Sequence, residues 1–211
     1  MTKGSELEQA AHLAEELLCD KPNRLAHVRE VAETARRVTG ACGIDPDLLI
    51  SAAWLHDIGY ADAAVQTGFH PLDGARYLRS IAFDERVVSL VAHHSFAVLE
   101  AWERGLEGVL TAEFVAPPAE LADALCFCDM TTGPTGDDVT LDERLTEIRV
   151  RYGAEHIVTR FIDRAEPELR AAIARVEARL TGTAALTVSR GRARRCRRGD
   201  GRDVCASRDA S

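Results

Sequence analysis

Residues 45–60 read DPDLLISAAWLHDIGY, and this stretch decides the fold. Asp45 is a favourable helix N-cap, and Pro46 suits the first helical turn, where a missing N–H costs nothing. From residue 48 to residue 55 nearly every side chain is apolar, so the helix has no polar face to turn toward solvent. We therefore expect it to run through the middle of the protein.

The C-terminal end of this helix carries an imidazole and a carboxylate side by side, His56 and Asp57. Gly59 follows them and can adopt the left-handed conformation that ends a helix. Burying two such polar groups is costly unless a charged or hydrogen-bonding partner meets them. A divalent metal ion would be such a partner.

The segments on both sides of this helix also repeat apolar residues at helical spacing. No segment alternates apolar and polar residues long enough to indicate a strand. We therefore predict an all-α fold, a compact multi-helix bundle in which residues 96–118 begin helical and pass into a loop. The other predicted helices cover residues 5–19, 23–40, 70–78, 84–94, 119–130, 140–153 and 167–182.

Length and composition predict one helical domain over residues 1–182, followed by a basic, disordered tail over residues 183–211. The chain has 211 residues, 46% of them hydrophobic, and no apolar run approaches the roughly 18 residues that a membrane span needs. Its start does not resemble a signal peptide. The six cysteines form no CxxC pair. We therefore expect a cytoplasmic protein with reduced thiols and no membrane partner.

The net charge of −8 is distributed unevenly. From Arg190 onward the chain carries eight arginines against three aspartates, so the rest of the protein is strongly acidic. An acidic body argues against a nucleic-acid-binding surface on the folded domain. The basic tail leaves an RNA-binding or acidic-partner arm open, although a solvated tail without function is the simpler interpretation.

Ligand-type side chains gather at the ends and inward faces of the predicted helices. Histidine and carboxylate ligands of this kind suit Fe, Mn, Co or Zn, and the set lacks the paired cysteines of a structural zinc cluster. A lone histidine on an apolar face is more often a hydrogen-bonded core residue than a ligand, so the weight lies on the set as a whole. Its members are His27, His56, Asp57, His70, His93, His94 and Asp129.

The order of these residues resembles that of the HD superfamily of metal-dependent phosphohydrolases, which is named after its adjacent His-Asp pair. The segments RLAHVREVAETA, AAWLHDIGY, HPLDGARYL and LVAHHS are each similar to segments of that family. The resemblance covers about residues 23–130. It implies an all-helical HD-domain-like fold, here in a small stand-alone protein.

The resemblance also implies a ligand set and a chemistry. In such proteins the equivalents of His27, His56, Asp57 and Asp129 hold a first metal, and Asp57 bridges to a second. His70 would bind that second ion with a histidine of the HH pair, where helical spacing favours His94 while His93 stays open, or both bind. The cofactor is then one or two divalent ions, Mn, Fe, Co, Mg or Zn, that activate a water. No GYP segment follows HHS, unlike the cyclic-dinucleotide branch.

The predicted activity is hydrolysis of a small phosphomonoester or phosphodiester, a nucleotide being one option, with His56 and Asp57 as catalytic residues. Arg24, Thr131 and Thr132 are candidate phosphate contacts. Two alternatives use the same ligands: a di-iron oxygenase of the HD type, and a non-catalytic metal-binding regulatory protein. The sequence leaves the substrate and the oligomeric state open.

Overall fold

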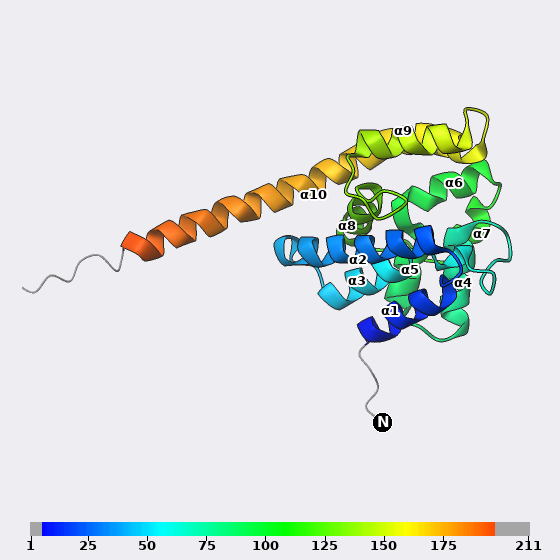
Figure 1. Cartoon of the computed structure of the whole chain (residues 1–211), viewed down its shortest axis with the longest axis horizontal. Coiled ribbons are helices and arrows are strands. Elements are labelled where there is room, and N and C mark those ends of the chain that lie inside the picture. The colour runs from blue at the N-terminus through cyan, green and yellow to red at the C-terminus, as the bar shows by residue number, and fades with distance from the viewer. Residues whose placement is uncertain (1–5, 197–211) are drawn as a thin grey trace, which may run out of the picture.

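The computed structural model describes residues 6–196, except for the side chains of residues 41–42 and 183–196. This part of the chain is built from helices, with a single antiparallel bridge between Thr132 and Asp138, so the all-α prediction is confirmed (Figure 1). The elements are α1 (Glu6–Leu17), α2 (Pro22–Cys42), α3 (Pro46–Leu55), η1 (Ile58–Tyr60), α4 (His70–Ser80), α5 (Glu85–His93), η2 (His94–Phe96), α6 (Ala97–Glu103), α7 (Glu107–Glu113), α8 (Ala119–Met130), α9 (Leu141–Tyr152) and α10 (Ile157–Cys196).

Helix α3 is the centre of the fold, as its composition predicts. The side chain of Asp45 caps it by accepting a hydrogen bond from the backbone N–H of Asp47 at 3.2 Å. Every residue from 48 to 55 is buried. Helices α1, α2, α5 and α8 contact α3, so its last turn delivers the residues that follow it into the interior.

A second, smaller core lies between α8, α9 and α10. There the structure differs from the predicted start of the last helix, because Pro167 lies inside α10 and not at its first turn. Proline inside a helix costs about 3 kcal/mol. The turns before it bury Phe161 and Ile162, each worth about 1.5–3 kcal/mol, and this burial offsets the cost.

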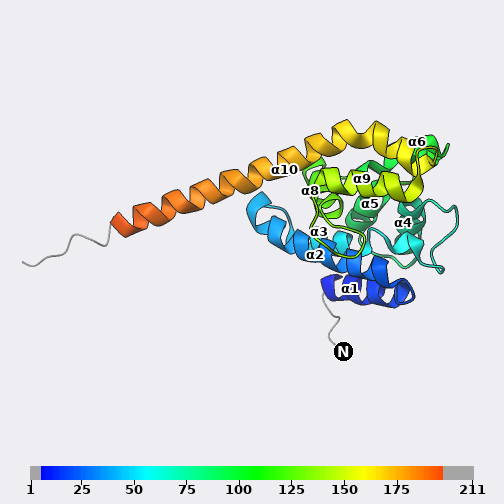
Figure 2. The same cartoon turned by 45° about the horizontal axis from the view of Figure 1, so that its top comes forward.

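The C-terminal part of α10 projects away from the other helices (Figures 1 and 2). The sequence predicts an end of this helix at residues 181–182, whereas α10 continues to Cys196. The remaining tail, residues 197–211, lies outside the described residues, so the structure does not test the disorder predicted there.

The region between α5 and α8 holds more helix than the sequence pattern indicates. Helices α6 and α7 both form, and each is only seven residues long, too short to show several apolar repeats. None of the helices within residues 6–196 combines the length and the apolarity that a membrane span requires.

Candidate metal centre

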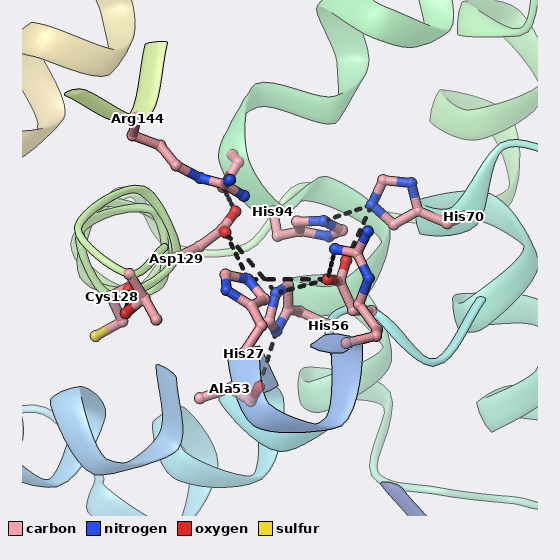
Figure 3. A network of polar contacts seen from close by, with 12 residues as sticks. His27, Ala53, His56, His70, His94, Cys128, Asp129 and Arg144 are labelled. Carbon is pink, nitrogen blue, oxygen red and sulfur yellow. Dashed lines mark hydrogen bonds and ion pairs between the residues drawn. The ribbon is translucent and has the colours of Figure 1, made fainter. Parts of the chain in front are cut away.

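Six ligand-type side chains from separate parts of the sequence meet at one place (Figure 3). All except His70 are at least nine-tenths buried. They come from α2, the C-terminal end of α3, the start of α4, the α5–η2 junction and α8. In chain order they are His27, His56, Asp57, His70, His94 and Asp129.

The six fall into two groups that share a border. His27, His56 and Asp129 form one group, and Asp57, His70 and His94 form the other; within each, ligand atoms lie within 4.8 Å of one another. The carboxylate of Asp57 faces both groups. Its Oδ2 lies 3.8 Å from Nε2 of His27 and 3.5 Å from Nε2 of His56, and its Oδ1 lies 3.3 Å from Nε2 of His70.

Backbone carbonyls set the tautomers of three of these histidines. Nδ1 of His27 lies 2.9 Å from the carbonyl oxygen of Gly133, and Nδ1 of His56 lies 2.8 Å from that of Ala53. Nδ1 of His94 makes the same contact with a carbonyl of α5 at 2.7 Å. A carbonyl oxygen only accepts, so each Nδ1 donates its hydrogen. The neutral rings of His56 and His94 then present a bare Nε2 to the centre, whereas Nε2 of His27 lies 3.2 Å from Oδ1 of Asp129.

The arrangement fits a divalent metal ion. Nε2 of His56 is buried and has no hydrogen-bond partner among the described residues, which is costly unless an ion meets it. Burial lowers the pKa of His56, and burial together with the neighbouring His70 lowers the pKa of His94 to about 3. Both rings are therefore neutral at physiological pH, which is the form that binds metals.

The carboxylates are ionised despite their burial. Burial opposes ionisation of Asp57, but Arg24 and His56 hold its pKa well below the ordinary value. The guanidinium of Arg24 donates to Oδ2 of Asp57 at 2.5 Å and lies over the ring of Tyr60, 4.1 Å from its centroid. For Asp129, burial is again outweighed, here by the hydrogen bond from His27, so its pKa is also lowered.

The position of His70 depends on a close contact between the backbones of η1 and α4. A Cβ at Gly59 would lie 2.0 Å from the carbonyl oxygen of His70, so only glycine lets η1 touch the start of α4 there. The carboxylate of Asp73 holds the preceding loop by accepting hydrogen bonds from the backbone N–H groups of residues 66–68. The ring of Tyr60 stacks on that of His70 with centroids 4.2 Å apart.

Three of the predicted site residues lie elsewhere. His93 is directed away from the centre, and its Nε2 contacts the carbonyl oxygen of Phe114 at 3.0 Å, so of the HH pair only His94 joins the cluster. The hydroxyls of Thr131 and Thr132 donate to carbonyls of α8, at 2.7 and 2.8 Å. Neither threonine lines the cavity beside the cluster, and their role as phosphate contacts stays a prediction.

Two residues that the sequence analysis missed also lie at the centre. The hydroxyl of Ser95 donates to Oδ2 of Asp129. Ser95 and Phe96 both have positive φ, 47° and 61°, a strained turn that directs the serine inward directly after His94. Arg144 of α9 lies close to Asp129 and helps to lower the pKa of that carboxylate. Only Ser95 had a signal in the sequence, its place directly after the HH pair.

A small cavity of about 80 Å³ opens beside the cluster. Asp57, His70, His94 and Asp129 form one side of it. Arg24, Arg144 and Arg151 also line it, and apolar side chains of α9 and α10 close the other side. The space is compact, and it brings the candidate ligands, guanidinium groups and an apolar surface together.

Comparisons with known proteins agree with this geometry. Residues 24–133, just over half of the chain, match the family model of the HD domain. The chain is 39% identical over 90 residues to ribonuclease Y of Acidothermus cellulolyticus (42% of this chain, 18% of that protein) and 36% identical over 85 residues to ribonuclease Y of Opitutus terrae (40% and 16%). It is also 38% identical over 77 residues to a tRNA (cytidine(56)-2'-O)-methyltransferase of Thermoplasma volcanium (36% and 22%).

The chain therefore spans about a fifth of the length of these relatives. No solved structure matches it. The family model covers every one of the six clustered side chains. On this match, the chain belongs to the HD domain family.

Proposed function

We propose that the chain is a metal-dependent phosphohydrolase that cleaves a phosphomonoester or phosphodiester. The observation that carries the proposal is the convergence of imidazole Nε2 atoms on the carboxylate of Asp57, which faces both ligand groups. One or two divalent ions would be held there by His27, His56, Asp57, His70, His94 and Asp129. When bound, such ions lower the pKa of a coordinated water and stabilise charge on phosphate oxygens.

The residues of the chain have separate tasks in this proposal. Asp57 has one oxygen toward each ligand group, so a single carboxylate can serve both. Arg24 donates to the same carboxylate and keeps it ionised and oriented. Ser95 orients Asp129 by donating from its hydroxyl to Oδ2 of that carboxylate. The carbonyls that accept from Nδ1 of the histidines prevent the rings from rotating away from the centre.

The similarity to two ribonuclease Y proteins makes RNA a second candidate substrate. The size of the cavity favours a compact ligand over a polymer, because it provides about 80 Å³ beside the cluster. The acidic body disfavours a polynucleotide as well. We therefore place small phosphate esters first.

The test starts with metal analysis of the purified protein and a phosphate-release screen over nucleotides, sugar phosphates and simple alkyl phosphates, with an RNA oligonucleotide in parallel. We expect release from a small ester that requires Mn, Fe, Co, Mg or Zn. His56→Ala and Asp57→Ala should each abolish release and reduce the bound metal while circular dichroism remains that of the wild type. Oxygen consumption by the iron-loaded protein would instead indicate an oxygenase. Bound metal with neither activity would indicate a regulatory role.

A further inference from the structure

Arg144 is an unusual residue in this fold. It belongs to α9, outside the segment that matches the family, yet it lines the cavity and is only 6% exposed. Its Nε is buried and has no hydrogen-bond partner among the described residues. A buried, partly unpaired guanidinium is costly unless an anion completes its hydrogen bonds.

The partner that Arg144 does have leaves part of its guanidinium free. Its Nη1 donates to Glu147, one turn along α9, at 2.6 Å. The other carboxylate oxygen of Glu147 pairs with Arg151, so one carboxylate is shared between two arginines. Both arginines line the cavity, Arg144 deep inside and Arg151 toward solvent. Arg144, Arg151 and Glu147 together carry a net positive charge, and the two arginines lie across the cavity from the candidate metal ligands.

Apart from Tyr152, the other side chains of α9 and α10 that line the cavity are apolar. Ile148 lies one turn after Arg144 on the same face of α9, and Val158, Phe161 and Ile162 of α10 continue the surface. None of these side chains can hydrogen-bond to a sugar hydroxyl or a base edge. A ligand that fills the cavity would therefore place an anionic group against Arg144 and an apolar group against α10.

From this geometry we infer that Arg144 binds the phosphoryl group of a small phosphomonoester whose alcohol part is apolar and packs against Ile148, Val158 and Phe161. The inference rests on the proposed phosphohydrolase function and adds the substrate class to it. A phosphomonoester fits because its organic group leaves the phosphorus in one direction only. The cluster and Arg144 surround the phosphate, and the apolar wall receives the remainder.

Binding of inorganic phosphate tests the role of Arg144 without any turnover. Its affinity for the metal-loaded protein is measured by isothermal titration calorimetry in wild type, Arg144→Gln and the control Arg149→Gln. Arg149 is on the same helix but pairs with Asp163 and Glu166 outside the cavity. We expect Arg144→Gln to weaken phosphate binding roughly tenfold to a hundredfold, the range for a lost hydrogen bond to a charged group. The control should match wild type, and metal content should be equal in all three.

Unchanged phosphate affinity in a folded, metal-loaded Arg144→Gln protein would overturn the inference. Should that variant fail to fold, Arg144→Lys keeps the charge and the apolar stem but loses the planar fork. It should still weaken phosphate binding several-fold, and affinity equal to wild type would again refute the role. A wild type that binds phosphate through Arg144 but hydrolyses no ester would contradict the proposed function alone.

The preference for an apolar alcohol group is tested with two esters of similar size, butyl phosphate and glycerol 3-phosphate. We expect wild type to have the higher kcat/KM for butyl phosphate. Val158→Thr, which replaces a methyl group by a hydroxyl at nearly constant volume, should reduce that preference about fivefold. A preference for glycerol 3-phosphate in wild type, or a ratio that Val158→Thr leaves unchanged, would contradict the apolar specificity.

Discussion

Replacing Gly59 by alanine tests how tightly the candidate centre depends on one backbone contact. A Cβ at this position would lie 2.0 Å from the carbonyl oxygen of His70, 2.7 Å from its carbonyl carbon and 2.8 Å from the backbone nitrogen of Gly74. All three atoms belong to the backbone, so no side-chain rotation relieves the clash. Ordinary contact begins near 3.4 Å, and the start of α4 must therefore move about 1.4 Å away from η1.

The movement has a cost in stability and a local consequence. Overpacking a well-packed site costs about 1–3 kcal/mol, and a backbone clash lies at or above the upper end. We expect Gly59→Ala to lower the free energy of unfolding by about 3 kcal/mol, which corresponds to a fall in Tm of roughly 6–12 °C for a protein of this size. Because His70 leads α4, its Nε2 should also leave Asp57, now 3.3 Å away, and metal stoichiometry should fall.

The assay is urea unfolding of the metal-free protein followed by circular dichroism, together with metal titration of the folded variant. Gly40→Ala is the matched control, because that glycine lies in α2 and no heavy atom is within 4 Å of a Cβ there. Alanine in a helix should make the control more stable by about 0.5–1 kcal/mol. If Gly59→Ala is as stable as wild type and binds as much metal, the close contact between η1 and α4 does not hold in solution.

Three further predictions concern groups around the same centre. Ser95→Ala removes the hydrogen bond to the buried carboxylate of Asp129 and should lower the free energy of unfolding by about 1.5–3 kcal/mol, measured by urea unfolding. The pKa of His94 falls from 6.5 in the unfolded chain to about 3, so only the unfolded state takes up a proton at intermediate pH. Stability of the metal-free protein should thus decrease by up to about 1.4 kcal/mol per unit as pH falls from 6.5 toward 4.5, and a flat profile would contradict a buried neutral ring. Burial raises the pKa of Cys126, which should resist iodoacetamide at pH 8 while the exposed Cys19 reacts, as peptide mass spectrometry would report.

The sequence was most informative where the composition of a segment allows only one environment for it. A segment as apolar as residues 48–55 has no stable place on a surface, so both its helical state and its central position follow from the residues alone. The polar pair at its end, His56 and Asp57, must then be buried as well. Fold class and the position of the candidate centre were predictable for this reason.

Side-chain direction was less predictable than helical position. Helical spacing favours His94 but leaves His93 open, and the choice depends on where α5 ends. The helix stops at His93, and His94, with φ −59° and ψ 148°, lies inward and donates from Nδ1 to the carbonyl of Val91. His93 instead reaches a carbonyl of the α7–α8 connection, a long-range contact that has no signature near residue 93.

The same distinction explains why the sequence analysis named the threonines after α8 and missed the arginine of α9. Thr131 and Thr132 follow Asp129 directly, but the last turn of a helix offers free carbonyls, and their hydroxyls donate to these. Arg144 lies fifteen positions beyond Asp129, in a helix that the capping box of Thr140 predicts but whose docking no local pattern encodes. The hydroxyls of these two threonines are thus used by the backbone, whereas Arg144, on a separately packed helix, keeps part of its guanidinium free for a ligand. In this fold the family segment supplies the candidate metal ligands, and selectivity for the substrate would then come from α9 and α10, which pack over the cavity from outside that segment.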